Sequence, residues 1–333
     1  MKPFVSVIIP CYNEERTIAL LLQALDAQTY PHERMEVVIA DGMSSDATRE
    51  RIAAFAASHP ALSVRVVDNP RRNIPAALNR ALDAAQGEII VRLDAHSVPN
   101  REYVQRSVAA LQAGRGDNVG GVWQIQPGAD TWIGRGIAAA AAHPLGVGDA
   151  RYRYATQAAA VDTVPFGAFY RTLVERIGAF DERLLSNEDY EFNTRIRQAG
   201  GTVWLDPGIQ ARYFARPTLR SLARQYWRYG FWKWRMLRRY PQTLRWRQAL
   251  PPVFVLSLLG LPLAGIWFPA AHWLWLLQIA AYLLLLGIVK VQIARQERSW
   301  AVGVGAALAV AVMQLTWGSA FLWSMLQSLF RKT

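Results

Sequence analysis

The chain has 333 residues, of which 52% are hydrophobic and 19% charged, and its formal net charge is +12 at pH 7. This composition is too apolar and too aromatic for a disordered protein. The single cysteine, Cys11, excludes an intramolecular disulfide framework and a cysteine-rich zinc module. The surplus of positive charge indicates an anionic partner, which is nucleic acid, anionic lipid or a phosphorylated substrate.

Residues 1 to about 115 alternate between two hydrophobic periods. Short apolar, β-branched runs are typical of buried parallel strands, and they occur at 5–9, 35–40, 64–67 and 88–93. Helical segments lie between them, at 18–25, 47–57 and 75–86. This order predicts an α/β domain with a mainly parallel sheet that is covered by helices on both faces. In such sheets, ligands bind beyond the carboxyl ends of the strands.

Polar side chains follow these apolar runs. Asp41 and Asp94 each come directly after one, where a carboxylate costs desolvation energy unless it has a partner. Asp94 and His96 can share one divalent ion and leave open positions for phosphate oxygens. The first predicted strand is not followed by a phosphate loop or by a dinucleotide-binding glycine motif, so an ATPase or an NAD-dependent enzyme has no support.

A basic and aromatic belt occupies Gly208 to Leu250, where eleven Lys and Arg residues occur without any Asp or Glu. Four arginines repeat at every fourth position, which places them on one face of a helix; they are Arg216, Arg220, Arg224 and Arg228. Interfacial helices that lie on a membrane surface have this composition. We therefore predict interfacial helices over 208–249. Recognition of a polyprenyl pyrophosphate by some of these arginines is a compatible second role.

Three uncharged apolar runs follow the belt, at 250–268, 271–289 and 300–330. Each is long enough to cross a hydrocarbon core of about 30 Å, which needs roughly 20 residues. We predict spans at about 250–268, 271–290 and 300–325, and we expect the over-long third run to continue along the interface or to fold back. The alternative is a buried helical hairpin in a soluble protein. The flanking cations place residues 1–207 in the cytoplasm, at a bacterial inner membrane, and the N-terminus lacks the pattern of a signal peptide.

Several sequence motifs occur in a fixed order over residues 4 to about 230. They include Val5-Ser-Val-Ile-Ile-Pro-Cys-Tyr-Asn-Glu14, Val38-Ile-Ala-Asp-Gly-Met-Ser-Ser-Asp46, Gly87-Glu-Ile-Ile-Val-Arg-Leu-Asp94, Glu188-Asp189 and Arg195-x-x-x-Ala-Gly200. Together they resemble the family 2 glycosyltransferases, and within that family the ExoA-like branch of succinoglycan biosynthesis. The resemblance implies a Rossmann-like GT-A fold in 1–207, followed by the interfacial segment 208–249 and by a membrane domain in 250–330.

The resemblance also implies a set of site residues. Those expected to bind the nucleotide sugar are Pro10, Tyr12, Asn13, Glu14, Asp41, Asn73, Asn79, Arg92, Asp94, Gln225 and Arg228. Asp41 would face the uracil edge, while Asp94 would contact the ribose or, together with His96, hold Mn²⁺ or Mg²⁺. The family usually has a carboxylate where His96 stands.

The acidic pair Glu188–Asp189 matches the catalytic pair of the family, whose second member is the base. The alternative is that both acids only stabilise the start of a helix over 189–199 through its dipole. Gln225-Tyr-Trp-Arg228-Tyr229 corresponds to the Gln-x-x-Arg-Trp motif of processive synthases. Because its last residue is Tyr, processive synthesis is not expected.

The predicted function is therefore a metal-dependent, inverting hexosyltransferase. It would transfer a hexose, for example glucose, from a UDP-sugar to a polyprenyl-linked saccharide in exopolysaccharide or cell-surface glycan synthesis. One alternative is direct transfer to polyprenyl phosphate. Two other classes are a membrane-tethered nucleic-acid-binding protein and an inactive membrane scaffold. No nucleic acid is expected as a partner, because the cations adjoin the first apolar run.

Overall fold

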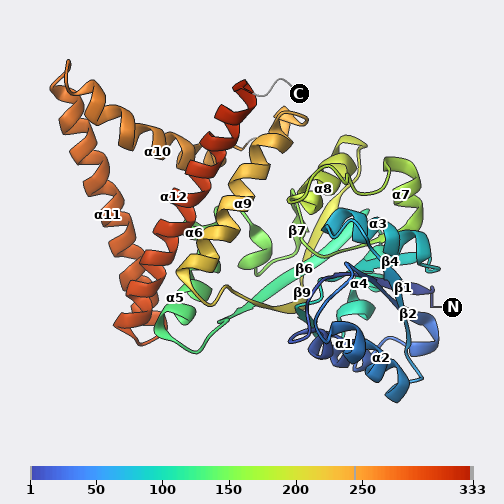
Figure 1. The fold of residues 1–333 in the computed structure, drawn as a ribbon. Helices are drawn as coiled ribbons and strands as arrows, with labels where there is room; N and C mark the ends of the chain where they lie inside the picture. Colours follow the sequence, from blue (N-terminus) through green and yellow to red (C-terminus); the bar gives the residue numbers. More distant parts are fainter. Residues whose placement is uncertain (1, 244, 331–333) are drawn as a thin grey trace. The chain divides into compact units, whose positions relative to one another are not determined.

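The computed structural model describes residues 2–243 and 245–330. The chain forms two compact units, and Figure 1 traces both. The first contains Met1–Gln124 and Arg151–Tyr213, and the second contains Ile125–Ala150 and Phe214–Thr333. The sequence predicted that residues 125–150 belong to the N-terminal domain 1–207. This segment belongs to the second unit because Ile137 and Ala140 are buried there in one apolar cluster with Ala306 and Met313.

Among the described residues, nine strands form one mixed sheet in the order β3-β2-β1-β4-β8-β6-β9-β5, with β7 paired to β9. The first four strands are β1 (Val5–Cys11), β2 (Met35–Asp41), β3 (Ser63–Asp68) and β4 (Ile89–Arg92). β1 pairs in parallel with β2 and β4, and β2 pairs in parallel with β3. The α/β prediction with a parallel N-terminal sheet is therefore confirmed.

The remaining strands make the other part of the sheet antiparallel. They are β5 (Ser97–Pro99), β6 (Asn118–Gln126), β7 (Ala159–Ala160), β8 (Gly167–Tyr170) and β9 (Val203–Phe214). β8 is antiparallel to both β4 and β6, and β9 is antiparallel to both β5 and β7. β9 also corrects one prediction, because 208–214 is strand and not interfacial helix. Its side chains alternate, with Ile209, Ala211 and Tyr213 buried, which is the period of a strand.

Helices cover both faces of the sheet, because its central strands are apolar on both sides. Ile9 and Ile39 pack with Leu21 on one face, while Ile8 and Leu78 pack on the other. The helices of this unit are α1 (Ile18–Asp26), α2 (Thr48–Ser58), α3 (Ile74–Ala84), α4 (Tyr103–Gln112), α7 (Arg171–Ile177) and α8 (Glu188–Gln198), with short 3₁₀ turns at His32–Arg34 and Arg151–Arg153.

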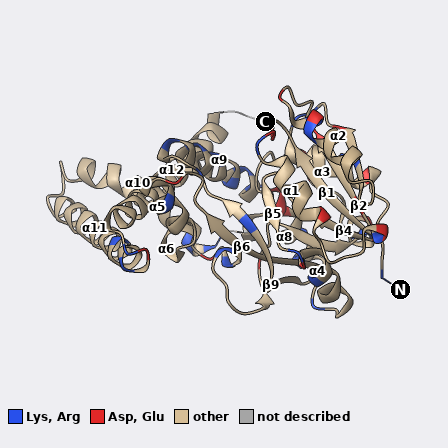
Figure 2. Cartoon of the chain, turned by 90° about the horizontal axis from the view of Figure 1, so that it is seen from below, with Lys and Arg blue, Asp and Glu red and all other residues tan. Residues whose placement is uncertain are grey.

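The second unit is helical. It consists of α5 (Trp132–Ala141), α6 (Pro144–Val147), α9 (Leu219–Leu237), the 3₁₀ turn Pro241–Thr243, α10 (Trp246–Ala264), α11 (Ala270–Gln296) and α12 (Trp300–Phe330). In the described part of the chain, three helices, α10, α11 and α12, are long and apolar enough to cross a membrane. Figure 2 shows that α10 and α11 carry few charged residues.

α12 is one uninterrupted helix of 31 residues. Of the two alternatives for 300–330, the fold-back is therefore wrong, and continuation along the interface stays a prediction. The run contains no proline that would break the helix. Its small residues also let neighbouring helices approach closely. A Cβ atom added to Gly318 would lie 2.5 Å from the Pro251 carbonyl oxygen of α10, and one added to Gly303 would lie 2.4 Å from the Lys290 carbonyl oxygen of α11.

Candidate active site

The loops that follow β1 and β2 are joined by reciprocal hydrogen bonds. The Asn13 amide donates to the Ser44 hydroxyl at 2.8 Å, and the Ser45 amide donates to Asn13 Oδ1 at 2.9 Å. Asn13 adopts a left-handed conformation with φ of 53°, which asparagine tolerates better than most residues. The side chain predicted to bind the nucleotide therefore contacts the neighbouring loop and shapes the rim of the site.

Asp41, at the end of β2, is fully buried and has the partners that its position requires. Its carboxylate accepts hydrogen bonds from the Ser44 amide at 3.0 Å and from Arg49 Nε at 2.5 Å. Arg49 also forms an ion pair with Asp68. Arg49 was not predicted from the sequence as the partner of Asp41. Its position eight residues after Asp41, on the following helix, is the signal that could have identified it.

Tyr12 is available for a planar ligand at this rim. Its side chain is 45% exposed, and its ring lies so close to Gly42 that a Cβ atom there would be 3.0 Å from Tyr12 Cδ2. The Arg72 guanidinium lies 5.9 Å from the ring centroid. Pro10, by contrast, is buried within β1 and pairs in register with Ala40. Of Pro10 and Tyr12, only Tyr12 presents its side chain at the surface.

Asn73 and Asn79 were predicted to bind the nucleotide, and the structure gives both of them contacts within the protein. Asn73 caps α3 by accepting a hydrogen bond from the Ala76 amide. Asn79 donates to the Phe180 carbonyl and to Glu182, and it accepts from the Phe180 amide. These hydrogen bonds use the oxygen and the nitrogen of the Asn79 amide group. Asn79 therefore holds the segment that leads to α8.

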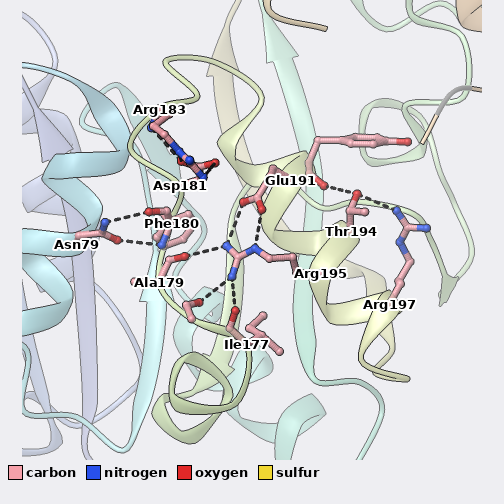
Figure 3. A network of polar contacts seen from close by, with 12 residues as sticks. Asn79, Ile177, Ala179, Phe180, Asp181, Arg183, Glu191, Thr194, Arg195 and Arg197 are labelled. Atoms are coloured by element: carbon pink, nitrogen blue, oxygen red, sulfur yellow. Dashed lines mark hydrogen bonds and ion pairs between the residues drawn. The ribbon is translucent and has the colours of Figure 1, made fainter. Parts of the chain in front are cut away.

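Figure 3 shows a second set of hydrogen bonds that hold the segment before α8 in place. Arg195 on α8 donates hydrogen bonds to the carbonyl oxygens of Ile177, Gly178 and Ala179, and it pairs with Glu191 one turn earlier. A guanidinium with several fixed partners is a rigid support. The loop before the acidic pair is thus held by Asn79 on one side and by Arg195 on the other.

Arg92 joins the end of β4 to the start of α8. Its guanidinium is buried, and its Nη2 atom donates to Glu188 Oε1 at 2.8 Å and to Asp94 Oδ1 at 3.3 Å. The Nε and Nη1 atoms are also buried, and they have no partner among the described residues. A buried charge of this kind is stable only when opposite charges surround it. Arg92 therefore brings Glu188 and Asp94 together.

Asp189 lies in the first turn of α8 and is half-buried. Burial and the neighbouring Glu188 carboxylate raise its pKa to about 7, while the Arg92 charge and a hydrogen bond from the Tyr190 amide act in the opposite direction. If Asp189 only stabilised the start of α8 through the helix dipole, its pKa would be lowered. A carboxyl group that titrates near neutral pH is suited to accept and release a proton.

Asp94 and His96 lie on the turn between β4 and β5, where the Asp94 carbonyl accepts a hydrogen bond from the Ser97 amide. His96 Nδ1 lies 3.1 Å from Glu14 Oε1, and such a carboxylate contact orients an imidazole ligand. Within residues 2–243 and 245–330, no group of three or more His, Cys, Asp or Glu side chains is arranged to hold a metal ion. That Asp94 and His96 hold an ion whose other ligands come from a bound diphosphate stays a prediction.

An aromatic cluster adjoins Asp189 and was missed in the sequence. Trp123 of β6 stacks on Tyr213 of β9, with ring centroids 4.1 Å apart. The buried Arg153 guanidinium lies 4.9 Å from the Trp123 ring and 5.4 Å from that of Tyr152. Burial raises the pKa of Tyr152, and the charge of Asp189 adds to this effect. No spacing pattern would have revealed a cluster drawn from three separate segments.

Gln225 and Arg228, the last of the predicted nucleotide-binding residues, lie on α9 in the second unit. Gln225 Nε2 donates to the Tyr229 hydroxyl at 2.9 Å, and the Arg228 side chain is exposed. Their contact with a nucleotide sugar stays a prediction.

Comparison with known proteins agrees with this architecture. The family model described as glycosyl transferase family 2 matches residues 6–178. The chain is 29% identical to the succinoglycan biosynthesis protein ExoA of Rhizobium meliloti, over 95% of this chain and 93% of that protein. It is 26% identical to the dolichyl N-acetyl-alpha-D-glucosaminyl phosphate 3-beta-D-2,3-diacetamido-2,3-dideoxy-beta-D-glucuronosyltransferase of Methanococcus voltae, over 79% and 82% of the two chains.

A solved structure shows the same fold. The mannosyltransferase PcManGT from Pyrobaculum calidifontis, in complex with GDP-Man and Mn²⁺, aligns with a TM-score of 0.59 and 24% identity, over 95% of this chain and 88% of that chain. The first unit therefore has the GT-A fold. Because the family model spans more than half of the sequence, this protein belongs to glycosyl transferase family 2.

Proposed function

We propose that this protein is an inverting glycosyltransferase that moves a hexose from a UDP-sugar to a polyprenyl-linked saccharide at a membrane. The observation that carries the proposal is Asp189, whose pKa is raised to about 7. It adjoins Glu188, which Arg92 connects to Asp94 at the end of β4. An inverting family 2 glycosyltransferase needs a base for the acceptor hydroxyl, and Asp189 is suited to that role.

Direct displacement explains the role of Asp189. The acceptor hydroxyl oxygen attacks the anomeric carbon, the bond from that carbon to the phosphate oxygen breaks, and UDP leaves with the electron pair. Asp189 takes the hydroxyl proton, which contributes about 10²–10⁴-fold to the rate. Because the acceptor attacks opposite the leaving group, the anomeric configuration inverts.

Asp94 and His96 would hold a divalent ion, Mn²⁺ or Mg²⁺. Such an ion stabilises the negative charge of the leaving diphosphate. The solved PcManGT complex contains Mn²⁺, which supports a divalent ion in this fold. The role of His96 can be separated from turnover by titrating Mn²⁺ into the protein in the presence of UDP, which supplies the diphosphate oxygens but no sugar, and recording the paramagnetic resonance spectrum. We expect weaker binding in His96→Ala and unchanged binding in His143→Ala.

The names of the relatives support the substrate classes. ExoA is named for succinoglycan biosynthesis, and the Methanococcus enzyme for transfer to a dolichyl-linked sugar. We propose that the first unit catalyses the transfer in the cytoplasm of a bacterial cell, that the basic segment 215–249 lies on the inner membrane, and that 250–330 spans it. Direct transfer to polyprenyl phosphate is the second candidate. Comparing lipid phosphate with lipid-linked saccharide as acceptors distinguishes the two.

The decisive experiment is Asp189→Asn in the full chain. We expect loss of transfer by about 10²–10⁴-fold, because the amide cannot accept the proton, while UDP affinity stays within about twofold. Asp83→Asn is the matched control, since Asp83 is exposed on α3. Release of UDP from a panel of UDP-sugars measures transfer, and calorimetry measures UDP binding. Near wild-type turnover by Asp189→Asn would exclude it as the base.

A further inference from the structure

A cavity of about 840 Å³ lies within the second unit, at the place where α5 faces the C-terminal end of α11. Figure 1 shows α5 beside the junction of α11 and α12. The α5 residues that line the cavity include Arg135, Ala138 and Ala139, which share one face of the helix. Ala138, Ala139, Ala142 and Ile293 supply the apolar part of its lining, which we call the apolar floor.

The rim of the cavity is polar, and two contacts frame it. A ring nitrogen of His143 lies 3.0 Å from Gln292 Oε1. Arg135 pairs with Glu297 at 3.4 Å. Both contacts join the α5 region to the end of α11. The opening is therefore fixed by side chains from two segments that are about 150 residues apart in the sequence.

The charges at the rim favour an anion. Arg135 and Arg295 both line the cavity, whereas Glu297 is the one acidic residue among its lining residues. Arg295 forms no ion pair with any residue in the described part of the chain. The amide groups of Gln126 and Gln296 add hydrogen-bond donors. Guanidinium and amide donors around one opening match an oxyanion with several oxygen atoms, such as phosphate.

The position of the cavity along α11 identifies the source of that phosphate. The middle of the helix exposes Leu283 and Leu284, and α11 has no Asp, Glu, Lys or Arg before Lys290. Figure 2 shows basic residues gathered at this end of α11. A spanning helix changes from apolar to charged where it leaves the hydrocarbon core, which is the level of the lipid phosphates.

We propose that this cavity binds the phosphate group of an anionic membrane lipid, with Arg295 and Arg135 as its main contacts. The apolar floor and the exposed leucines of α11 accommodate the hydrocarbon chain. Membrane phospholipids and polyprenyl phosphates share this chemistry. The inference concerns binding alone, and it holds whether or not Asp189 is the catalytic base.

The test uses the detergent-solubilised full chain and native mass spectrometry, so no turnover is required. Phosphatidylglycerol and undecaprenyl phosphate are titrated separately, and the affinity for the first bound lipid is measured for each. Arg295→Gln should weaken that affinity about tenfold, because a charged hydrogen bond to phosphate is lost. Arg298→Gln removes the same charge three residues further on, outside the cavity lining, and should change the affinity less than about twofold.

A second variant tests the cavity without changing its charge. Ala139→Leu fills part of the floor and should also weaken the affinity for the first bound lipid by about tenfold. The proposal can therefore be judged even if one variant fails to fold. Selective weakening with either lipid supports the proposal, and the two titrations show which lipid is preferred. Equal effects of Arg295→Gln and Arg298→Gln would overturn it, as would displacement of the lipid by inorganic phosphate at millimolar concentration.

Discussion

Asp189 and Arg92 show how their surroundings change the properties of single side chains. Both are ordinary charged residues in the sequence, and each differs in the fold because of its neighbours. Asp189 loses water and gains a like charge, so its pKa rises to about 7. Arg92 loses water and gains two carboxylate partners, Glu188 and Asp94. Two predictions follow from these surroundings.

The first prediction concerns pH. Because Asp189 must be ionised to accept a proton, kcat/KM should rise about tenfold per pH unit below pH ~7 and level off above it. A pH profile of UDP release measures this. A rate that stays constant from pH 5 to pH 8, within about twofold, would contradict it.

The same pKa determines how Asp189 affects stability. Its pKa is raised in the folded protein, so between pH ~4 and ~7 the native state binds more protons than the unfolded state. The contribution of Asp189 to the free energy of unfolding is fully present below pH ~4 and is lost as pH rises through ~7. The unfolding temperature of the wild type should therefore fall as pH rises over this range, whereas that of Asp189→Asn should lack this fall.

The second prediction concerns Arg92. Arg92→Met leaves the buried Glu188 carboxylate without its partner, which should cost about 3–5 kcal/mol. It should also raise the pKa of Asp189 further, since the Arg92 charge lowers it. The unfolding temperature in detergent and the pH profile measure the two effects. Replacing the ion pair in Arg92→Met/Glu188→Leu should recover most of the stability. An unfolding temperature of Arg92→Met equal to wild type would contradict the role of Arg92.

Glycines determine how closely the helices of the second unit pack. A Cβ atom on Gly136 of α5 would lie 2.6 Å from the backbone nitrogen of Ala306 in α12. No such atom can be accommodated unless one helix moves. Gly260 of α10 is different, because an added Cβ atom there would meet nothing within 4 Å.

We therefore expect Gly136→Ala to destabilise the protein by about 1–3 kcal/mol through overpacking. Gly260→Ala, the same chemical change in an open place, should be neutral or stabilise the helix by up to about 1 kcal/mol. Thermal unfolding of both variants in the same detergent compares them. If Gly136→Ala is as stable as Gly260→Ala, the close contact between α5 and α12 is absent.

The whole chain exposes much apolar surface on α10 and α11. Leu259, Trp273 and Leu277 are each at least 67% exposed, which a protein in water tolerates only rarely over so large an area. A membrane that surrounds these helices would cover this surface. The basic belt alone would instead give a peripheral attachment that salt weakens.

We expect the full chain to remain in the membrane fraction after washing with high salt or alkaline carbonate, and to be released by detergent. Charge attraction to headgroups is screened by salt, whereas burial of apolar helices is not. Sedimentation followed by immunoblotting measures the distribution. Release by salt alone would show that the protein lies on the surface and would contradict the three spans.

The sequence by itself determined the features that depend on neighbours along the chain. Apolar runs predicted β1 to β4, the 3.6-residue period predicted the helices between them, and uncharged stretches predicted α10 to α12. Ordered motifs identified the family. These signals are local, because a strand or a spanning helix shows its burial in its own few residues.

Only the tertiary structure decided what the polar residues do. Asn79 bonds to Phe180, 101 residues away, and Arg92 to Glu188, 96 residues away; no local pattern records such a partner. The fold likewise placed 125–150 with the C-terminal helices and kept 300–330 as one helix. A pKa, an ion pair or a cavity depends on distance in space, and distance between remote segments is fixed only when the chain has packed.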